Sequence, residues 1–433
     1  MSASPVEIAP GASDVPEACD IMVIGGGPAG ATAAALLAAG GRRVVLADKD
    51  RHPRFHIGES LLPRNLAIFD RLGLREQVHA LGVFKPGAEF VTDATGEQVT
   101  FSFASGLDRR YTHCYQVPRA AFDTVLLANA RAKGAVVLEE TRVVGAAFAA
   151  DGRSVVSARG SQGTVRRFAA RFVLDATGRD TLLAGQFGLK TADKHINSAA
   201  VYAHFRNVEA RTGEHAGCIT VHLAAEGWFW MIPLPDGIMS VGFVSGRAAF
   251  KSRPGGTGDL LFERIAASPT VAARMRAAEL VSEVTATGNY SYRSSAAWGE
   301  GWMLIGDAFG FLDPVFSSGV LLAMASAEMG AAVADAWLDD PAAGRALARR
   351  SERRLRRSMD ELSWLIRRIN DPVLRHMFLH PTNRFRMRDG LVSVLAGHFL
   401  YERPGYGLPL AAFKAAFYLL SGARRMGLGM AAG

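Results

Sequence analysis

Near its N-terminus the chain carries the segment Asp20-Ile21-Met22-Val23-Ile24-Gly25-Gly26-Gly27-Pro28-Ala29-Gly30. A short apolar run that ends at a glycine loop predicts a buried parallel strand. The segment 29–39 that follows is rich in alanine and leucine, has no interior breaker, and predicts a helix. The chain therefore opens its fold with a strand, a tight glycine turn and a helix.

In this context the glycine loop predicts a dinucleotide site. Gly25 makes the tight turn, Gly27 lets a pyrophosphate approach the backbone, and Gly30 lets the helix pack on the strand. The N-terminus of the helix then stabilises the negative charge of the phosphates. Pro28 and Ala29 stand at that end of the helix and are counted as binding residues.

The next apolar segment, 43–48, closes a βαβ unit. It ends at Asp48, which lies 18 residues beyond Gly30. An acid at this position accepts hydrogen bonds from a ribose. We count Asp48 and the neighbouring Lys49 as binding residues, although the fingerprint does not separate NAD from FAD.

Composition sets broad limits on the class of protein. The chain has 433 residues, of which 49% are hydrophobic, so it can build two or three domains. Three widely spaced cysteines indicate a reducing compartment, and hence the cytoplasm, rather than a disulfide scaffold or a structural zinc site. Residues 1–18 lack the features of a signal peptide and are expected to be a disordered leader. No apolar run reaches about 18 residues, so we expect no membrane span.

The patterning along the chain predicts an α/β fold. Alternating strand and helix signals assign 19–192 and 296–338 to a Rossmann-like domain. Short alternating segments between 193 and 295 predict an inserted antiparallel β layer for the substrate. The rest, 339–433, is expected to be a helical C-terminal region.

The positive charge is concentrated near the C-terminus. Twelve arginines and four acids lie between Arg349 and Arg388, and their net +8 equals the charge of the whole chain. A solvated helix face with paired charges is the simpler interpretation. A docking surface for an acidic carrier protein or an anionic membrane is the alternative. Aromatic-interleaved basic repeats are missing, so we expect no nucleic acid partner.

Four further segments resemble the FAD-dependent monooxygenases of the glutathione-reductase fold type. They are Arg54-Phe55-His56-Ile57-Gly58-Glu59-Ser60, Tyr115-Gln116-Val117-Pro118-Arg119, Asp175-Ala176-Thr177-Gly178 and Gly306-Asp307-Ala308. Together with the glycine loop they stand in the order that this superfamily has, over roughly residues 18–335. The resemblance implies FAD as the cofactor. It assigns cofactor contacts to Arg54, Gly58, Glu59, Ser60, Arg119, Asp175, Ala176, Gly178, Gly306 and Asp307.

Within this superfamily, the segment Trp228-Phe229-Trp230-Met231-Ile232-Pro233 resembles the W-x-W-x-I-P segment of the flavin-dependent halogenases. The spacing of Trp228 and Trp230 puts both indoles on one face of a strand. The resemblance implies that they lie beside the flavin and keep organic substrate away from it.

Lys85, in Phe84-Lys85-Pro86-Gly87-Ala88, resembles the K-x-G-A segment that carries the essential lysine of the halogenases. A lysine held among apolar groups can lose its proton. The resemblance implies that Lys85 is catalytic and presents the electrophilic halogen to the substrate.

The segment 311–320, with Pro314, Ser318 and Gly319, resembles the halogenase pattern F-x-D-P-x-x-S-x-G. In that family the backbone N–H groups at its end hold the halide near the flavin. Backbone donors at the start of a helix form a suitable anion site. The resemblance therefore implies that chloride or bromide binds at Ser318 and Gly319, and that Pro314 and Gly319 also contact FAD.

The family resemblance implies a reaction sequence. Reduced FAD reacts with oxygen, the halide is oxidised to hypohalous acid, and this acid passes through the interior to Lys85, where an electron-rich arene is halogenated. A base then removes the ring proton, and Glu59 and His113 are candidates by residue type. Position 177 is threonine where the hydroxylases have aspartate, so we expect no NADPH site and a separate flavin reductase.

Phe316 stands where tryptophan halogenases have a glutamate. This difference favours a phenolic or pyrrolic substrate, either free or bound to an acyl or peptidyl carrier protein. Three alternatives stay open. They are a flavin hydroxylase or geranylgeranyl-reductase-like enzyme, a flavin-binding interaction protein of a biosynthetic assembly, and an enzyme bound to a membrane surface through its C-terminal segment.

Overall fold

A computed structural model describes residues 15–150, 152–193, 198–246, 250, 255–288, 291–400 and 407–426. Most of the expected leader, residues 1–14, lies outside this part of the chain. Glu17 and Ala18, which we assigned to the leader, already belong to the first strand.

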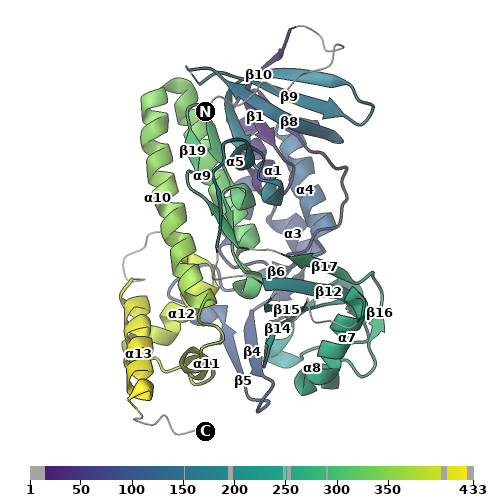
Figure 1. The fold of residues 1–433 in the computed structure, drawn as a ribbon, viewed down its shortest axis with the longest axis vertical. Helices are drawn as coiled ribbons and strands as arrows, with labels where there is room; N and C mark the ends of the chain where they lie inside the picture. Colours follow the sequence, from purple (N-terminus) through teal and green to yellow (C-terminus); the bar gives the residue numbers. More distant parts are fainter. Residues whose placement is uncertain are drawn as a thin grey trace.

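The first layer is a mainly parallel sheet with the strand order β19-β20-β10-β1-β2-β7. Its parallel strands pair in register from β20 across to β7, as a Rossmann-like fold requires. β8 and β9 extend it as an antiparallel hairpin beside β10 (Figure 1). The bounds are β1 (Glu17–Ile24), β2 (Val44–Ala47), β7 (Val136–Leu138), β8 (Thr141–Phe148), β9 (Ser154–Gly160), β10 (Val165–Asp175), β19 (Trp298–Gly299) and β20 (Trp302–Leu304).

Helices cover this sheet and bring the chain back to it. The helix α1 (Pro28–Ala39) packs against α4 (Arg119–Ala132) and α9 (Gly319–Asp339). Its small side chains allow this close packing, because nine of its twelve residues are buried. By length and composition α9 could cross a membrane, but most of it is buried inside the fold.

The second layer is a sheet in the order β16-β12-β15-β14-β13-β4-β5, with β17 beside β12. It is antiparallel except for the parallel pair β13 and β4. β4 (Gly87–Thr92) and β5 (Gln98–Ser102) come from the segment 19–192, so this layer is not built from 193–295 alone. The other strands are β12 (Ser198–Arg206), β13 (Ile219–Ala224), β14 (Gly227–Pro233), β15 (Met239–Gly246), β16 (Glu279–Leu280) and β17 (Thr285–Gly288).

The second layer also contains two helices that the alternating pattern did not predict. The helix α7 (Thr257–Ala267) packs against β12, β15 and β17, and α8 (Pro269–Arg274) follows it. Their apolar residues form a second core with Phe229 and Met231 of β14. The alternate residues of β14 are therefore left to face the first layer.

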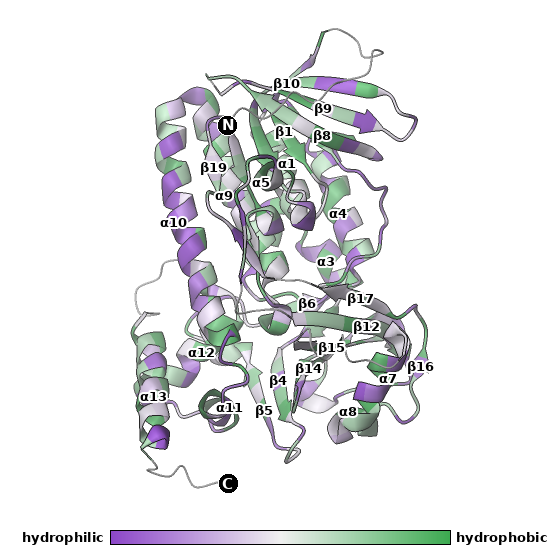
Figure 2. Ribbon diagram, viewed as in Figure 1, coloured by the Kyte–Doolittle hydropathy of each residue, from purple (hydrophilic) through white to green (hydrophobic). Residues whose placement is uncertain are grey.

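The C-terminal region is helical, as expected. The long helix α10 (Pro341–Ile366) packs along α9, and Figure 2 shows its outer face as strongly hydrophilic. Several of its charges are paired, including Arg356 with Glu352 one turn away. The helices α11 (Pro372–Leu379), α12 (Met387–Leu395) and α13 (Gly407–Arg425) gather beside β4 and β5 (Figure 1).

Short elements connect the two layers. The strands β3 (Val83–Lys85) and β6 (Cys114–Gln116) form a separate two-stranded antiparallel sheet. The remaining ones are α2 (Asn65–Leu72), α3 (Arg75–Leu81), α5 (Leu182–Gln186), β11 (Lys190–Ala192), β18 (Tyr292–Ser294) and β21 (Gly310–Phe311).

Candidate active site

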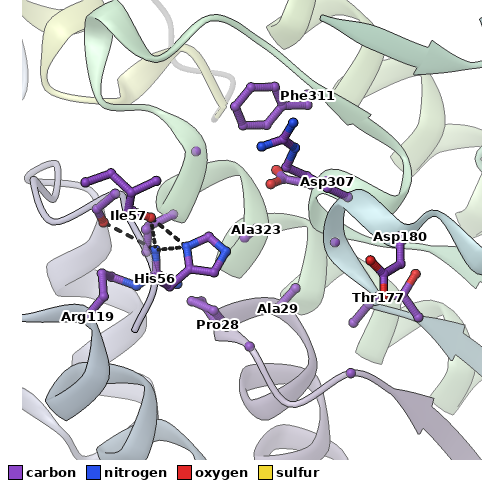
Figure 3. A pocket seen from close by; sticks show the side chains of 18 of the residues that line it. Pro28, Ala29, His56, Ile57, Arg119, Thr177, Asp180, Asp307, Phe311 and Ala323 are labelled. Carbon is purple, nitrogen blue, oxygen red and sulfur yellow. Dashed lines mark hydrogen bonds between the residues drawn. The ribbon is translucent and has the colours of Figure 1, made fainter. Parts of the chain in front are cut away.

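A cavity of about 850 Å³ is lined by residues of both layers. Its wall includes the glycine loop, the end of β2, the loop 54–60, the turn after β10, the strands β12 and β14, and the start of α9. Figure 3 shows how Pro28 and Ala29, His56 and Ile57, and Asp307 with Phe311 surround it. Its volume is in the usual range for cofactor sites.

The glycine loop fits a pyrophosphate. Gly25 has φ +103°, and a Cβ there would lie 2.4 Å from the carbonyl oxygen of Ala176. A Cβ on Gly30 would lie 1.8 Å from the carbonyl oxygen of Gly25, so this glycine makes the helix–strand contact and does not line the cavity. Gly27 faces the cavity, and the nearest atom to a Cβ there is 3.8 Å away. The backbone is thus open to a ligand where the motif requires it.

Asp48 supports the glycine loop from the end of β2. Its Oδ2 accepts a hydrogen bond of 2.5 Å from the N–H of Gly26, and its Oδ1 accepts one of 2.8 Å from the N–H of Asp50. The guanidinium of Arg54 lies 3.9 Å from the same carboxylate. Lys49 also lines the cavity, where its amine donates to Asp180 at 2.5 Å.

The loop 54–60 is fixed by Arg119 from the start of α4. Arg119 is buried, donates two 2.9 Å hydrogen bonds to Asp123, and donates one of 2.8 Å to the carbonyl of Ile57 (Figure 3). Burial, and then the charge of Arg119, lower the pKa of His56 to about 4, so this ring is neutral at physiological pH. Arg54, Gly58, Glu59 and Ser60 all line the cavity, as does Arg119.

The turn after β10 forms another part of the cavity wall, but Asp175, which we expected to contact the cofactor, does not line the cavity. Asp175 is buried behind the cavity, and its carboxylate accepts hydrogen bonds from Thr177 and from the N–H of Leu183. It therefore shapes the turn that exposes Ala176 and Gly178 to the cavity. Asp307 lies across from this turn, and burial raises its pKa to about 6. Gly306, just before it, does not line the cavity.

Trp228 and Trp230 of β14 lie side by side in the cavity wall, with ring centroids 6.0 Å apart. The Nε1 of Trp230 donates to the hydroxyl of Ser240 at 3.1 Å. Gly242, its partner on β15, leaves room for the ring, because a Cβ there would lie 2.2 Å from it. Both indoles are therefore held in place on the face of β14 that the spacing predicts.

The N-terminus of α9 opens into the same cavity. Gly319 is the first residue of this helix and, with Pro314, lines the cavity. Ser318, at the N-cap position, is buried and lines neither cavity, and Ser317 before it has φ +54°. The helix dipole and the free N–H groups of this end suit a small anion.

Lys85 does not line the large cavity. Its side chain is only 1% exposed, and its Nζ donates 2.8 Å hydrogen bonds to the hydroxyl of Ser60 and the carbonyl of Leu61. The Nζ also lies 5.3 Å from the centre of the Phe103 ring. Burial lowers the pKa of Lys85 to about 8, and no carboxylate of the described chain forms an ion pair with it.

A second, much smaller cavity of about 10 Å³ lies beside Lys85, with room for about one water molecule. Apolar side chains form most of its wall, and none of the described residues that line it is acidic. Ile219 and Ser317 line both cavities and so form the partition between them. The other lining residues are Leu62, Ala88, Phe90, Phe103, Val221, Val315, Phe316 and Leu395.

The two candidate bases do not line the small cavity. Glu59 faces the large cavity, and His113 stacks on Phe84 at 4.7 Å outside both. Residues that the motifs did not predict also build the site, among them Tyr202, Ile219 and Ser317. Ser317 lies inside the halogenase-like segment and was within reach of sequence reasoning. Tyr202 and Ile219 belong to alternating strands that carry no motif.

The comparisons with known proteins agree with this geometry. The family model described as an FAD binding domain matches residues 18–361. Fold and site thus define an FAD-binding protein of the monooxygenase superfamily.

Two curated relatives are halogenases by name. A tryptophan 2-halogenase of Chondromyces crocatus is 37% identical over 73% of this chain, which spans 61% of that protein's length. A 1H-pyrrole-2-carbonyl-[peptidyl-carrier protein] chlorinase of Pseudomonas fluorescens is 29% identical over 72% of this chain and 74% of its own.

Two solved structures extend the likeness over most of the chain. The myxobacterial chondrochloren halogenase CndH is 30% identical, with a TM-score of 0.78 over 93% of this chain and 97% of its own. A flavoprotein/dehydrogenase of Cytophaga hutchinsonii is 28% identical, with a TM-score of 0.85 over 95% and 100%. The chain belongs to the flavin-dependent halogenases.

Proposed function

We propose that this protein oxidises chloride or bromide with reduced FAD and oxygen, and that Lys85 transfers the halogen to an electron-rich aromatic ring. The single observation that carries this proposal is the environment of Lys85. Its amine is buried, has no carboxylate partner in the described chain, and stands behind a two-residue partition from the FAD-sized cavity. A structural lysine would be expected at the surface or in an ion pair.

Different residues of the chain have different roles in this reaction. Bound FAD supplies the oxidising chemistry, while the N–H groups of Ser318 and Gly319 hold the halide at the cavity face of α9. Trp228 and Trp230 fill the wall where an organic substrate would otherwise meet the cofactor. The lowered pKa of Lys85 lets its amine exchange between donating a hydrogen bond and accepting the halogen near neutral pH.

The substrate that fits best is a neutral aromatic ring of the phenol or pyrrole type. Phe316 and Phe90 line the space beside Lys85, and no described acidic residue is there to pair with the ammonium group of a free amino acid. The name of one relative includes a pyrrolyl group on a peptidyl carrier protein, which supports a carrier-bound substrate as one form of it. A separate flavin reductase would deliver reduced FAD, and we expect the reaction to take place in the cytoplasm.

The test uses the purified protein with FAD, a flavin reductase with NADH, oxygen and bromide. Free phenols, pyrroles and indoles, and the same rings on a carrier protein, are supplied, and products are analysed by mass spectrometry. We expect a product that carries the bromine isotope pattern, and we expect its yield to fall at least about 100-fold in Lys85→Ala. Lys133→Ala, at an exposed lysine remote from both cavities, is the matched control and should retain wild-type activity.

Oxygen insertion without bromine, persisting in Lys85→Ala, would instead identify a flavin hydroxylase. Turnover with NADPH alone would identify a reductase-like enzyme and exclude the separate reductase. Brominated tryptophan as the only product would overturn the substrate class while retaining the halogenase reaction.

A further inference from the structure

Glu59 and His204 form a buried pair at the wall of the large cavity. Glu59 is 1% exposed and lines the cavity, and its Oε1 accepts a 2.7 Å hydrogen bond from Nε2 of His204. Its Oε2 is buried and has no hydrogen-bond partner in the described chain. A buried carboxylate oxygen without a donor is costly, so this atom is placed for a proton or a donor that comes from the cavity side.

His204 connects the pair to the outside of the molecule. It lies on β12 two residues beyond the cavity-lining Tyr202, and its side chain is 19% exposed. The ring of Phe55 packs edge-on against it, with centroids 5.8 Å apart, and is itself 57% exposed. The pair therefore reaches from the closed wall of the cavity to the solvent at its rim.

The chemistry of the proposed function requires such a connection. Reduced FAD, oxygen, halide and one proton give oxidised FAD, hypohalous acid and water, written FADH2 + O2 + X⁻ + H⁺ → FAD + HOX + H2O. Formation of hydrogen peroxide from reduced FAD and oxygen consumes no net proton. Proton uptake is therefore coupled to the halide, and the proton must reach the halide site inside the FAD cavity.

Resting on that proposed function, we propose that His204 and Glu59 are the relay that carries this proton from solvent into the FAD cavity. At the start of a cycle the carboxyl of Glu59 is neutral, with its proton on Oε2, and this proton goes to the cavity. The carboxylate left behind takes the Nε2 proton of His204 at Oε1, while the other ring nitrogen of His204 takes a proton from solvent. Rotation of the carboxyl group returns its proton to the cavity side, and loss and regain of ring protons return the Nε2 proton to His204. No bond other than those to the proton is made or broken.

Other ionisable groups of the cavity are less suited to this path. The ring of His56 is bound to the carbonyl of Ile57 and faces Arg119. Arg119 is tied to Asp123, and Lys49 is tied to Asp180. Asp48 is engaged by the backbone of the glycine loop and lies near Arg54. The carboxyl of Asp307 has no hydrogen-bonded partner in the described chain that could pass it a proton from solvent, and the charges of Arg119 and Arg179 favour its ionised form.

The test measures proton uptake with a pH indicator when reduced holoenzyme is mixed with oxygen, with and without bromide. We compare wild type, Glu59→Gln and His204→Asn. His380→Asn is the matched control, because His380 faces Glu97 at the surface away from both cavities. A second readout uses the FAD-free protein, in which NMR detects the hydrogen-bonded Nε2 proton of His204.

We expect bromide-dependent uptake to slow about 100-fold in Glu59→Gln and His204→Asn but not in His380→Asn. Added imidazole should restore the rate in His204→Asn, and the Nε2 resonance should move upfield in Glu59→Gln. Wild-type uptake rates in both relay variants, or slowing that imidazole does not restore, would overturn the relay. Absence of bromide-dependent uptake in the wild type would instead overturn the proposed function itself.

Discussion

The two cavities of this molecule are built in opposite ways. The large one has a volume of about 850 Å³, and its shape is set by backbone turns such as those at Gly25 and the N-terminus of α9. The small one holds about one water molecule and is closed by large side chains around Lys85. An aromatic ring cannot enter it as it stands. Backbone turns thus shape the FAD cavity in advance, whereas under the proposed function the side chains around Lys85 move to admit an aromatic ring.

The largest effect should come from the preformed cavity. Gly25→Ala puts a Cβ 2.4 Å from the carbonyl oxygen of Ala176 at φ +103°. We expect FAD affinity to fall about 10³-fold, which is about 4 kcal/mol. Gly134→Ala is the control, because Gly134 has φ +101° with no atom within 4 Å of its Cβ. Flavin fluorescence titration measures both, and equal losses would mean that backbone conformation rather than the close contact decides.

The closed cavity should respond to Phe316→Ala. This change removes a ring from the wall beside Lys85. The ring of Phe378, which stacks on Phe316, would have to move for the space to widen further. We expect a loss of about 3 kcal/mol in the free energy of unfolding and a shift in preference toward larger arenes. Phe205→Ala, in the separate core behind β14, should cost similar stability without that shift. An unchanged substrate preference in competition assays would show that substrates do not reach Lys85 from this side.

The charge of Lys85 should appear in the pH dependence of stability. Burial lowers its pKa to about 8 in the folded protein, whereas the unfolded chain has the ordinary value of 10.5. Between these values the unfolded state binds more protons, so the free energy of unfolding rises with pH. Relative to Lys85→Met, wild type should gain about 2 kcal/mol between pH 7.5 and pH 10. Denaturant titrations at several pH values measure this, and a constant difference would mean that the amine is solvated.

The partition itself should give the smallest effect. Ser317 has φ +54°, a conformation that costs a residue with a side chain about 1 kcal/mol. Ser317→Gly should therefore raise the free energy of unfolding by about that amount, and Glu140→Gly, at φ +52° on the surface, should do the same. Thermal unfolding compares them. A loss of stability in Ser317→Gly alone would show that its hydroxymethyl group supports the wall between the cavities.

The residues that line the large cavity could be predicted from the sequence better than those that line the small cavity, for a physical reason. Phosphate binding demands glycines and a helix start at fixed spacing, so those residues could be read directly from the motif. The partition and the Glu59–His204 pair arise from side chains of segments far apart in the chain. The parallel pairing of β4 with β13 likewise has no local signal. The sequence analysis therefore placed β4 and β5 in the Rossmann-like domain, whereas they belong to the second layer. Asp175 matched a motif, yet its carboxylate shapes a turn, because the motif does not say which of its atoms face the ligand.

The segment Gly58-Glu59-Ser60-Leu61 has a mechanical consequence. Gly58 and Glu59 border the FAD cavity, and the hydroxyl of Ser60 with the carbonyl of Leu61 holds the amine of Lys85. One stretch of backbone thus connects the two cavities mechanically. Any displacement of it by bound cofactor alters the acceptors of the amine, and by thermodynamic reciprocity the protonation of Lys85 alters the affinity for FAD. The protonation of Lys85 can in this way depend on whether FAD is bound.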